Sequence, residues 1–502
     1  MKYRYRTFFL IPACIITAFV MWADAQAQDF EDWKREQEAK FEEFKNEQDA
    51  AFMEMLQETW KFFDSDLRSE SLEEDKFQEI PEAPERPSEP AEESPDDEII
   101  EEPVEIDLPD EDQQMPTPAY EEPEPEQPEE ATKEELPANF ATSNFEFYQS
   151  PLQLFYDKTL TDIQKPASPN EEFISEYWEK MATSDYEFVL DHLKDEKNRM
   201  NLNDWGFAKL VYESADELYD SKNLALLFTW FMLTQADFKA RIGFDDEEIH
   251  LLLAFDNPVY SASFYTIEGT RYYAVSFNGK FPRTGRIQTY EGEHPDADRK
   301  LSLNIKEIPD FKNETHEREL KFTYRDSTYH LNVEVNSNLI DFYHYYPQTN
   351  LEVYFEAPVT DFTAQQVLEQ LSEIIEGKTK IVATNLLLRF SQTAFGYKID
   401  PENFGREKPL FPEETLFYDY SDCEDRAILF EFLVTNLLGL EVIGLEYPKH
   451  IATAVRFDHE AEGDYVYYKD RKFLISDPTY INADVGMEMP EFSNIQPEII
   501  SL

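Results

Sequence analysis

The residue with the clearest capacity for chemistry is Cys423, in the run Ser-Asp-Cys-Glu-Asp-Arg-Ala at 421–427. The chain has two cysteines, and the other, Cys14, lies in an apolar run near the start. If export removes that run, Cys423 has no intramolecular disulfide partner. Its thiol is then either inert in the core or kept for its reactivity.

The sequence around Cys423 favours reactivity. Ser421 and Asp422 are good residues to begin a helix. Apolar residues then recur at helical spacing: Ala427, Ile428, Phe430, Leu433, Val434, Leu437 and Leu438. Cys423 is therefore predicted in the first turn of a buried helix, where the positive dipole end favours a thiolate.

A thiol nucleophile also needs a base and a group that orients the base. His450 follows Cys423 by 27 residues, and Asp477 follows His450 by another 27. Both lie in, or at the end of, segments that read as strands. We expect a triad in which His450 takes the thiol proton and Asp477 holds the imidazole. The alternatives are a core thiol, a structural histidine and a plain strand-end aspartate.

These motifs resemble the transglutaminase-like (papain-like thiol) superfamily, closest to its bacterial cysteine-proteinase branch. The matching runs are Asp-Cys-Glu-Asp-Arg-Ala, Lys-His-Ile-Ala-Thr-Ala-Val and Ser-Asp-Pro-Thr, within about 360–492. Ser421 departs from the glycine that many members carry. The resemblance implies that Gln392 donates a side-chain hydrogen bond to the oxyanion, beside the Cys423 backbone amide. A glutamine at the edge of the core is the alternative for Gln392.

Three tyrosines are candidates to line the cleft of such an enzyme: Tyr397, Tyr418 and Tyr420. Glu424 and Asp425 also match the family motif. A carboxylate in the first helical turn suits the helix dipole, and we expect Asp425 to tie the helix to a neighbouring loop. We assign neither acid a chemical role.

Charge excludes nucleic acid as a partner. The chain has 106 acidic and 45 basic residues, a net charge of −61, and phosphate binding needs a basic face. No Cys-x-x-Cys, His-Glu-x-x-His or glycine-rich phosphate loop occurs. We therefore expect no metal and no cofactor.

The first 137 residues divide into three parts. Residues 1–27 have a basic start, an apolar middle and a small-residue end, and so predict a signal peptide and a periplasmic, secreted or cell-surface protein. An uncleaved signal would instead anchor the chain in a membrane. In residues 28–75, Phe30, Phe41, Phe52 and Phe63 recur every 11 residues, which predicts an amphipathic helix with an aromatic stripe on one face. That stripe would serve self-association, partner docking or packing within the chain. Residues 76–137 are acidic, proline-rich and predicted to be a disordered linker.

The remaining chain predicts an α+β fold in three parts: 138–290, helical then β; 291–360, a β-rich module; and 361–502, the transglutaminase-like domain. In the first part we expect helices and then strands. The helices are Phe173–Met181, Tyr186–Leu193, Trp205–Leu218 and Ala225–Leu233. The strands are Lys239–Phe244, Ile249–Phe255 and Arg271–Phe277. In the module we expect strands at Leu320–Tyr324, Tyr329–Val335 and Asn350–Phe355.

Residues 138–290 are either a degenerate copy of the catalytic domain or coincidentally similar. Two pairs of segments resemble each other, 220–228 with 422–430 and 271–277 with 471–477. His250 falls near the position that matches His450. The position of Cys423 is held by Ser221 or Lys222.

These observations favour hydrolysis of amide bonds in protein or peptide substrates through an acyl-enzyme on Cys423. Two alternatives stay open. The chain is an inactive transglutaminase-like scaffold that binds a partner, or it passes the acyl group to an amine and so cross-links proteins.

Overall fold

The computed structural model describes residues 47–66, 79–84, 139–163, 168–279 and 281–502. These residues form a mixed α+β structure with several antiparallel sheets, as expected from the sequence. The predicted signal peptide, residues 28–46 and 67–75 of the predicted helix, and most of the predicted linker lie outside the described residues. No helix among the described residues is both long and apolar enough to cross a membrane.

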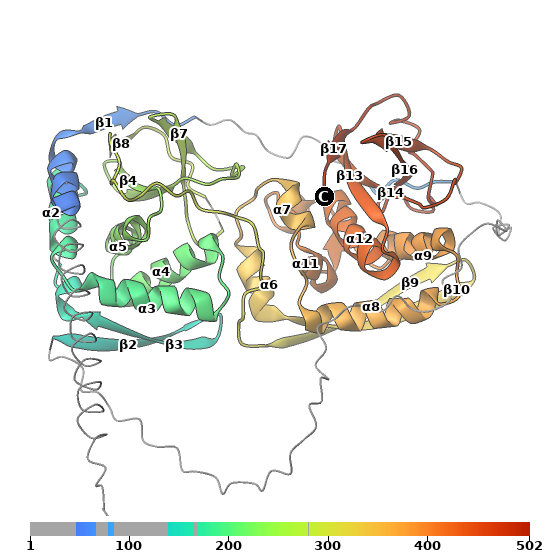
Figure 1. The fold of residues 1–502 in the computed structure, drawn as a ribbon, viewed down its shortest axis with the longest axis horizontal. Coiled ribbons are helices and arrows are strands. Elements are labelled where there is room, and N and C mark those ends of the chain that lie inside the picture. Colours follow the sequence, from blue (N-terminus) through green and yellow to red (C-terminus); the bar gives the residue numbers. More distant parts are fainter. Residues whose placement is uncertain (1–46, 67–78, 85–138, 164–167, 280) are drawn as a thin grey trace, which may run out of the picture.

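The amino-terminal half, residues 139–305, pairs a hairpin and helices with a larger sheet (Figure 1). The hairpin is β2 (Phe140–Phe147) and β3 (Ser150–Asp157), followed by a 3₁₀ turn, Lys158–Leu160. The helices are α2 (Glu171–Ala182), α3 (Tyr186–Arg199), α4 (Asp204–Leu218) and α5 (Lys222–Gln235). The sheet contains β4 (Ala240–Phe244), β5 (Ile249–Leu253), β6 (Phe264–Ile267), β7 (Thr270–Ala274) and β8 (Ile287–Tyr290). The predicted helices and three predicted strands of this half are confirmed, although α3 continues six residues beyond its predicted end at Leu193.

The carboxyl-terminal half, residues 306–502, also begins with a hairpin, β9 (Thr315–Tyr324) and β10 (Ser327–Asn336). Its helices are α6 (Ser337–His344), α7 (Leu351–Phe355), α8 (Asp361–Ile375), α9 (Lys380–Thr393), α10 (Asp400–Asn403), α11 (Pro412–Phe417) and α12 (Cys423–Leu438). A two-stranded parallel pair is made by β11 (Gly396–Tyr397) and β12 (Tyr420–Ser421). The main sheet contains β13 (Glu441–Tyr447), β14 (His450–Arg456), β15 (Tyr465–Tyr468), β16 (Arg471–Ser476) and β17 (Glu498–Ile500).

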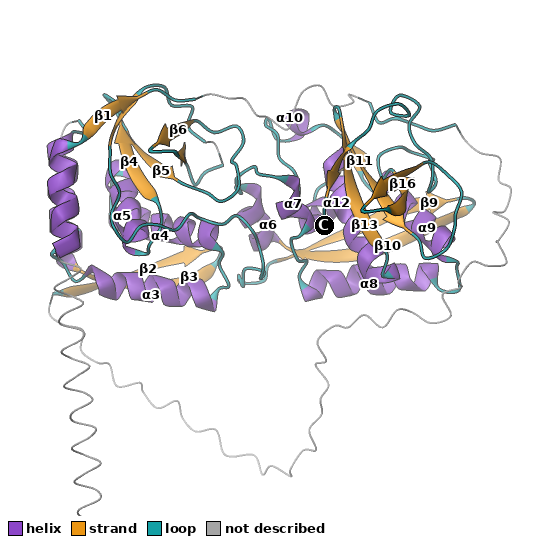
Figure 2. Cartoon of the chain, turned by 45° about the horizontal axis from the view of Figure 1, so that its top comes forward, coloured by secondary structure: helices purple, strands orange, loops and turns teal. Residues whose placement is uncertain are grey.

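The two main sheets have the same connectivity. The strand order is β8-β4-β5-β7-β6 in the amino-terminal half and β17-β13-β14-β16-β15 in the carboxyl-terminal half, and every pairing is antiparallel. Helix α5 packs on β4 and β5 as α12 packs on β13 and β14. Each half also places a helix on its own hairpin, α3 on β3 and α8 on β10 (Figure 2).

The segment before the linker contradicts the prediction of one continuous helix to residue 75. A helix covers 47–58 and ends before β1 (Trp60–Phe63), which pairs with β8 at the edge of the amino-terminal sheet. Phe52 and Leu56 are buried in the core. The described part of the aromatic stripe therefore packs within the chain. Residues 79–84, part of the predicted disordered linker, contact the carboxyl-terminal half.

The predicted β-rich module at 291–360 needs a second correction. Its first two strands are confirmed as the β9–β10 hairpin, but residues 337–344 and 351–355 are the helices α6 and α7. The hairpin packs on α8 and α9, so it belongs to the same body as the predicted catalytic domain. A short apolar run such as Asn350–Phe355 does not distinguish a strand from a buried helix by periodicity alone.

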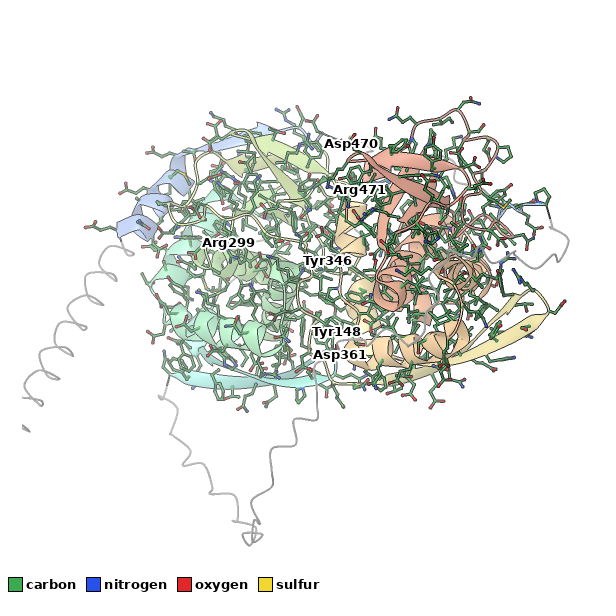
Figure 3. The ribbon with its side chains drawn as sticks, turned by 45° about the vertical axis from the view of Figure 1, so that its right-hand side comes forward. Tyr148, Arg299, Tyr346, Asp361, Asp470 and Arg471 are labelled. Atoms are coloured by element: carbon green, nitrogen blue, oxygen red, sulfur yellow. The ribbon has the colours of Figure 1, made fainter. Side chains whose placement is uncertain are left out.

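Tyr346 joins the two halves near the middle of the molecule (Figure 3). Its hydroxyl donates to the carbonyl of Leu303 at 2.5 Å and lies 2.6 Å from the Asn203 amide nitrogen, and its ring lies against Phe411. One apolar cluster, to which Phe52, Trp230 and Phe430 belong, runs through both halves.

Candidate active site

Cys423 is the first residue of α12, as predicted, and its side chain is buried. Asp422 caps the helix, and its backbone N–H donates to Asp425 Oδ2 at 3.1 Å. The other oxygen of Asp425 accepts the Leu410 backbone N–H at 2.8 Å. Asp425 therefore ties the start of α12 to the preceding loop, which confirms its expected structural role.

Because the chain turns back after α12, Cys423 lies at the end of the sheet where the strands carry the other candidate residues. Gly439 adopts a left-handed conformation, φ 61°, so the chain reverses there into β13, on which α12 packs. The 16 residues of α12 span about 24 Å and the seven residues of β13 span about 23 Å. The first residue of α12 therefore returns to the level of Tyr447, the last residue of β13.

His450 and Asp477 lie at that same end of the sheet and are hydrogen-bonded to each other. His450 begins β14 opposite Tyr447, and Asp477 directly follows β16. His450 Nε2 lies 2.8 Å from Asp477 Oδ2, with both side chains buried. Asp477 Oδ1 accepts the backbone N–H groups of Thr479 and Tyr480, at 2.9 and 3.1 Å. These contacts fix the carboxylate that orients the ring.

The histidine ring is also held by stacking. Phe492 lies parallel to it, with an interplanar angle of 7° and a centroid distance of 5.4 Å. Since Nε2 faces the Asp477 carboxylate, the neutral ring that donates there carries its lone pair on Nδ1. Nδ1 is therefore the nitrogen that can accept a proton from a substrate or a thiol.

Gln392 has different partners from those implied by the family resemblance. Its Nε2 lies 3.0, 2.7 and 3.1 Å from the backbone carbonyls of Asp477, Tyr480 and Ala483. An amide nitrogen has two N–H donors, and both are directed at this loop. The contacts give Gln392 a positioning role: it holds from α9 the loop that carries Asp477.

Arg426 is a buried cation for which we predicted no role. Its guanidinium donates to Ser421 Oγ at 3.1 Å and to the carbonyls of Gln392, Phe395 and Gly396 at 2.9, 3.1 and 3.2 Å. Burial lowers the pKa of Arg426 to about 10, so it stays charged at neutral pH. Four neighbours act in the opposite sense: Tyr397, Asp422, Asp425 and Cys423. A cation that interacts with the Cys423 sulfur favours a thiolate. The sequence does contain a signal for this role, because Arg426 is a charged residue within the apolar pattern of the predicted helix.

Buried carboxylates lie close to Cys423. Its Sγ donates to Glu424 Oε2 at 3.2 Å. Three sets of side chains offer ligand atoms within 4.8 Å of one another: Asp422, Cys423 and Glu424; Asp400, Glu407 and Glu424; and Asp400, Asp422 and Asp425. Carboxylate oxygens are ligands of hard cations such as Ca²⁺. These side chains could therefore hold a cation, although Asp400 and Asp425 also accept backbone N–H groups.

The three candidate tyrosines separate into two environments. Tyr397 and Tyr420 lie on the paired strands β11 and β12, where Tyr397 is opposite Ser421. Tyr397 lies 5.5 Å from the Arg426 guanidinium, and Tyr420 is exposed. Tyr418 instead places its hydroxyl 3.1 Å from His344 Nδ1. Two of the three therefore lie close to the start of α12.

The amino-terminal half has other side chains at the matching positions. Leu252 pairs with Ala274 on the outer face of its sheet, as Ala454 pairs with Ile475. Four residues before Leu252 is Glu248, and four before Ala454 is His450. His250 therefore corresponds to Ala452, two residues further along the strand on the same face, so it lies near the position that matches His450 but Glu248 occupies it. Two residues after Ala274 is Ser276, which, rather than Phe277, matches Asp477.

No protein-family model, curated protein or solved structure matches this chain. The resemblance to transglutaminase-like enzymes therefore stays a prediction from the sequence motifs.

Proposed function

We propose that this protein is a thiol enzyme that cleaves amide bonds of protein or peptide substrates through Cys423, His450 and Asp477. One observation carries the proposal. A buried histidine, hydrogen-bonded to a buried aspartate, lies at the end of the sheet where the first residue of α12 also lies. A cysteine at a helix start, a base and a group that orients the base are the parts that thiol catalysis needs.

The reaction begins when His450 Nδ1 takes the proton from Cys423. The sulfur attacks the amide carbonyl, and the positive end of α12 stabilises the oxyanion that forms. The C–N bond then breaks, and the imidazolium gives its proton to the departing amine. Water adds to the resulting thioester, releases the acid and regenerates the thiol. A lysine amine in place of water would give a cross-link instead.

The amino-terminal half has a contact between the two positions that correspond to Cys423 and His450. Lys222, the first residue of α5, corresponds to Cys423, and Glu248 corresponds to His450. The Lys222 ammonium lies 3.0 Å from Glu248 Oε2. In a sheet with the same strand order, side chains at these two positions therefore reach each other. We propose that the shorter side chains of Cys423 and His450, at the same two positions, also approach each other.

A second candidate function has its own observation. Cys423 is only 2% exposed, and its Sγ donates to Glu424. A buried thiol paired with a carboxylate fits an inactive scaffold that retains the fold for binding.

The rate of alkylation of Cys423 by iodoacetamide, measured against pH, separates the two functions. In an enzyme the wild-type thiol reacts well below the reference thiol pKa of about 8.5, and His450→Ala abolishes that acidic reactivity. His250→Ala is the matched control, a buried histidine of the other sheet, and should not change the profile. Cys423→Ser identifies the labelled residue. A wild-type profile that follows a free thiol, and that His450→Ala leaves unchanged, would contradict the enzyme and favour the scaffold.

A further inference from the structure

A short segment of the acidic amino-terminal region is bound beside Asp477. Residues 79–84, Glu-Ile-Pro-Glu-Ala-Pro, contain an isolated parallel β-bridge between Glu82 and Ile481. The Ala83 N–H donates to the Ile481 carbonyl at 2.7 Å, and the Ile481 N–H donates to the Pro81 carbonyl at 2.9 Å. Figure 1 draws the segment in blue in the carboxyl-terminal half, far from the blue helix that precedes it in the sequence.

The side chains of the segment alternate as in a strand. Ala83 is 4% exposed, whereas Glu82 and Pro84 on either side of it are exposed. Ala83 joins the apolar cluster on the face of the sheet opposite α12, which includes Tyr447, Tyr480 and Phe492. Backbone hydrogen bonds combined with burial of alternate side chains are the usual way in which an extended peptide is recognised.

The loop that receives the segment is the one that carries Asp477. On one side, α9 holds this loop through Gln392, and Arg389 donates to Asn482 Oδ1 at 2.6 Å. On the other side, the segment pairs with Ile481. Phe492, in the same cluster as Ala83, stacks on the His450 ring. The bound segment therefore contacts both the loop and the cluster that hold the two candidate residues.

We propose that the Asp477–Ala483 loop and the adjoining apolar cluster form a binding site for an extended Pro-x-Ala peptide. In this protein residues 79–84 fill the site and so position Asp477. The binding claim stands alone, whereas the consequence for Cys423 chemistry rests on the proposed function. The acidic amino-terminal region then acts as a tethered ligand, whose effective concentration at the site is of the order of millimolar.

Two full-length variants test the binding site. Ala83→Arg places a long charged side chain in the apolar cluster, and Glu82→Arg places the same side chain one residue away, where it is exposed. Hydrogen exchange of the Ile481 amide should accelerate at least tenfold in Ala83→Arg and stay as in the wild type in Glu82→Arg. Equal exchange in the two variants would overturn the proposal.

A labelled peptide with the sequence of residues 77–86 provides the second measurement. It should bind the Ala83→Arg chain, whose site is empty, and restore slow exchange at Ile481, which also shows that the variant is folded. It should bind the wild type at least tenfold more weakly, because the tethered segment competes. A peptide that binds neither chain, or that binds both equally, would overturn the proposal.

Iodoacetamide labelling tests the effect on Asp477. We expect Ala83→Arg to label Cys423 several-fold more slowly at pH 6 and added peptide to recover the rate. An unchanged rate, in a chain whose wild type shows the acidic reactivity, would overturn the positioning role. If the wild type lacks that reactivity, the proposed enzyme fails, yet exchange and peptide binding still decide whether the site exists.

Discussion

The two halves of this molecule contain sheets with the same strand order but carry different side chains at the matching end of the sheet. Both order five antiparallel strands alike, and both lay one helix on the two strands that follow it. At this end of the carboxyl-terminal sheet, His450 and Asp477 are buried and hydrogen-bonded to each other. At the matching end, Lys222 and Glu248 form an ion pair with both side chains more than half exposed. Connectivity alone therefore does not make a site.

The helices of the two halves show what the site requires. Counted from their first residues, Ala225 and Trp230 of α5 match Arg426 and Glu431 of α12. The two α5 residues are apolar and fully buried, so α5 is a core helix. The two α12 residues are ionisable: Arg426 is fully buried and Glu431 is half-buried. Helix α12 therefore carries the energetic cost of desolvated charge at two positions where α5 carries none.

The largest effect in this comparison should come from Asp477→Asn. The carboxylate that stabilises the imidazolium is lost, so the rate of Cys423 alkylation at pH 6 should fall on the order of 10²–10⁴-fold. Ser276→Ala, at the matching position of the other sheet, is the control and should leave the rate unchanged. Labelling of Asp477→Asn at the wild-type rate would mean that the His450–Asp477 pair serves structure alone.

Arg426→Met should produce the largest loss of stability. The carbonyls of Gln392, Phe395 and Gly396 lose their buried donor, which should lower the free energy of unfolding by about 3–5 kcal/mol. Urea unfolding followed by tryptophan fluorescence measures the change. Arg456→Met, which removes a half-exposed partner of Glu441, should cost less than about 1 kcal/mol. Equal losses in the two variants would show that the buried guanidinium has no special weight.

Several parts of the site could be predicted from the sequence because they depend on local patterns. Apolar spacing and the Asp422 cap predict α12, and the strand patterns predict the positions of His450 and Asp477. The role of Gln392 could not be predicted in this way. The partners of Gln392 come from a loop about 90 residues further along the chain, and no local pattern contains that information.

Competing patterns explain the errors in the fold. The 11-residue spacing of Phe52 and Phe63 favours one long helix, but the helix ends at residue 58 and Phe63 lies in β1, which pairs with β8. The proline-rich acidic composition of 76–137 predicts disorder throughout, so the six residues at 79–84 that bind beside Asp477 could not be recognised from composition. His250 lies near the position of His450 in the sequence repeat, but the strand pairing shifts the match by two residues, so Glu248 holds that position.

Glu431→Gln is the finest test of the difference between α5 and α12. Burial raises the pKa of Glu431 from its ordinary value of 4.5 to about 7, and the Thr435 hydroxyl, which donates to Oε1 at 2.8 Å, opposes this rise. The unfolded chain loses this proton near its ordinary pKa, whereas the folded chain keeps it until about pH 7. Stability from this group therefore falls as the pH rises from about 4.5 to 7 and stays low above that range.

Removing the charge should reverse that penalty. At pH 8, Glu431→Gln should raise the free energy of unfolding by about 1–3 kcal/mol, and at pH 4 the difference should vanish. Urea unfolding at the two pH values measures it. Glu373→Gln on α8, an exposed helical glutamate, should change stability by less than about 0.5 kcal/mol at either pH. A Glu431→Gln chain that is no more stable at pH 8 than the wild type would mean that α12 holds its charged residues at as little cost as an exposed helix, and the contrast with α5 would then lie in Arg426 alone.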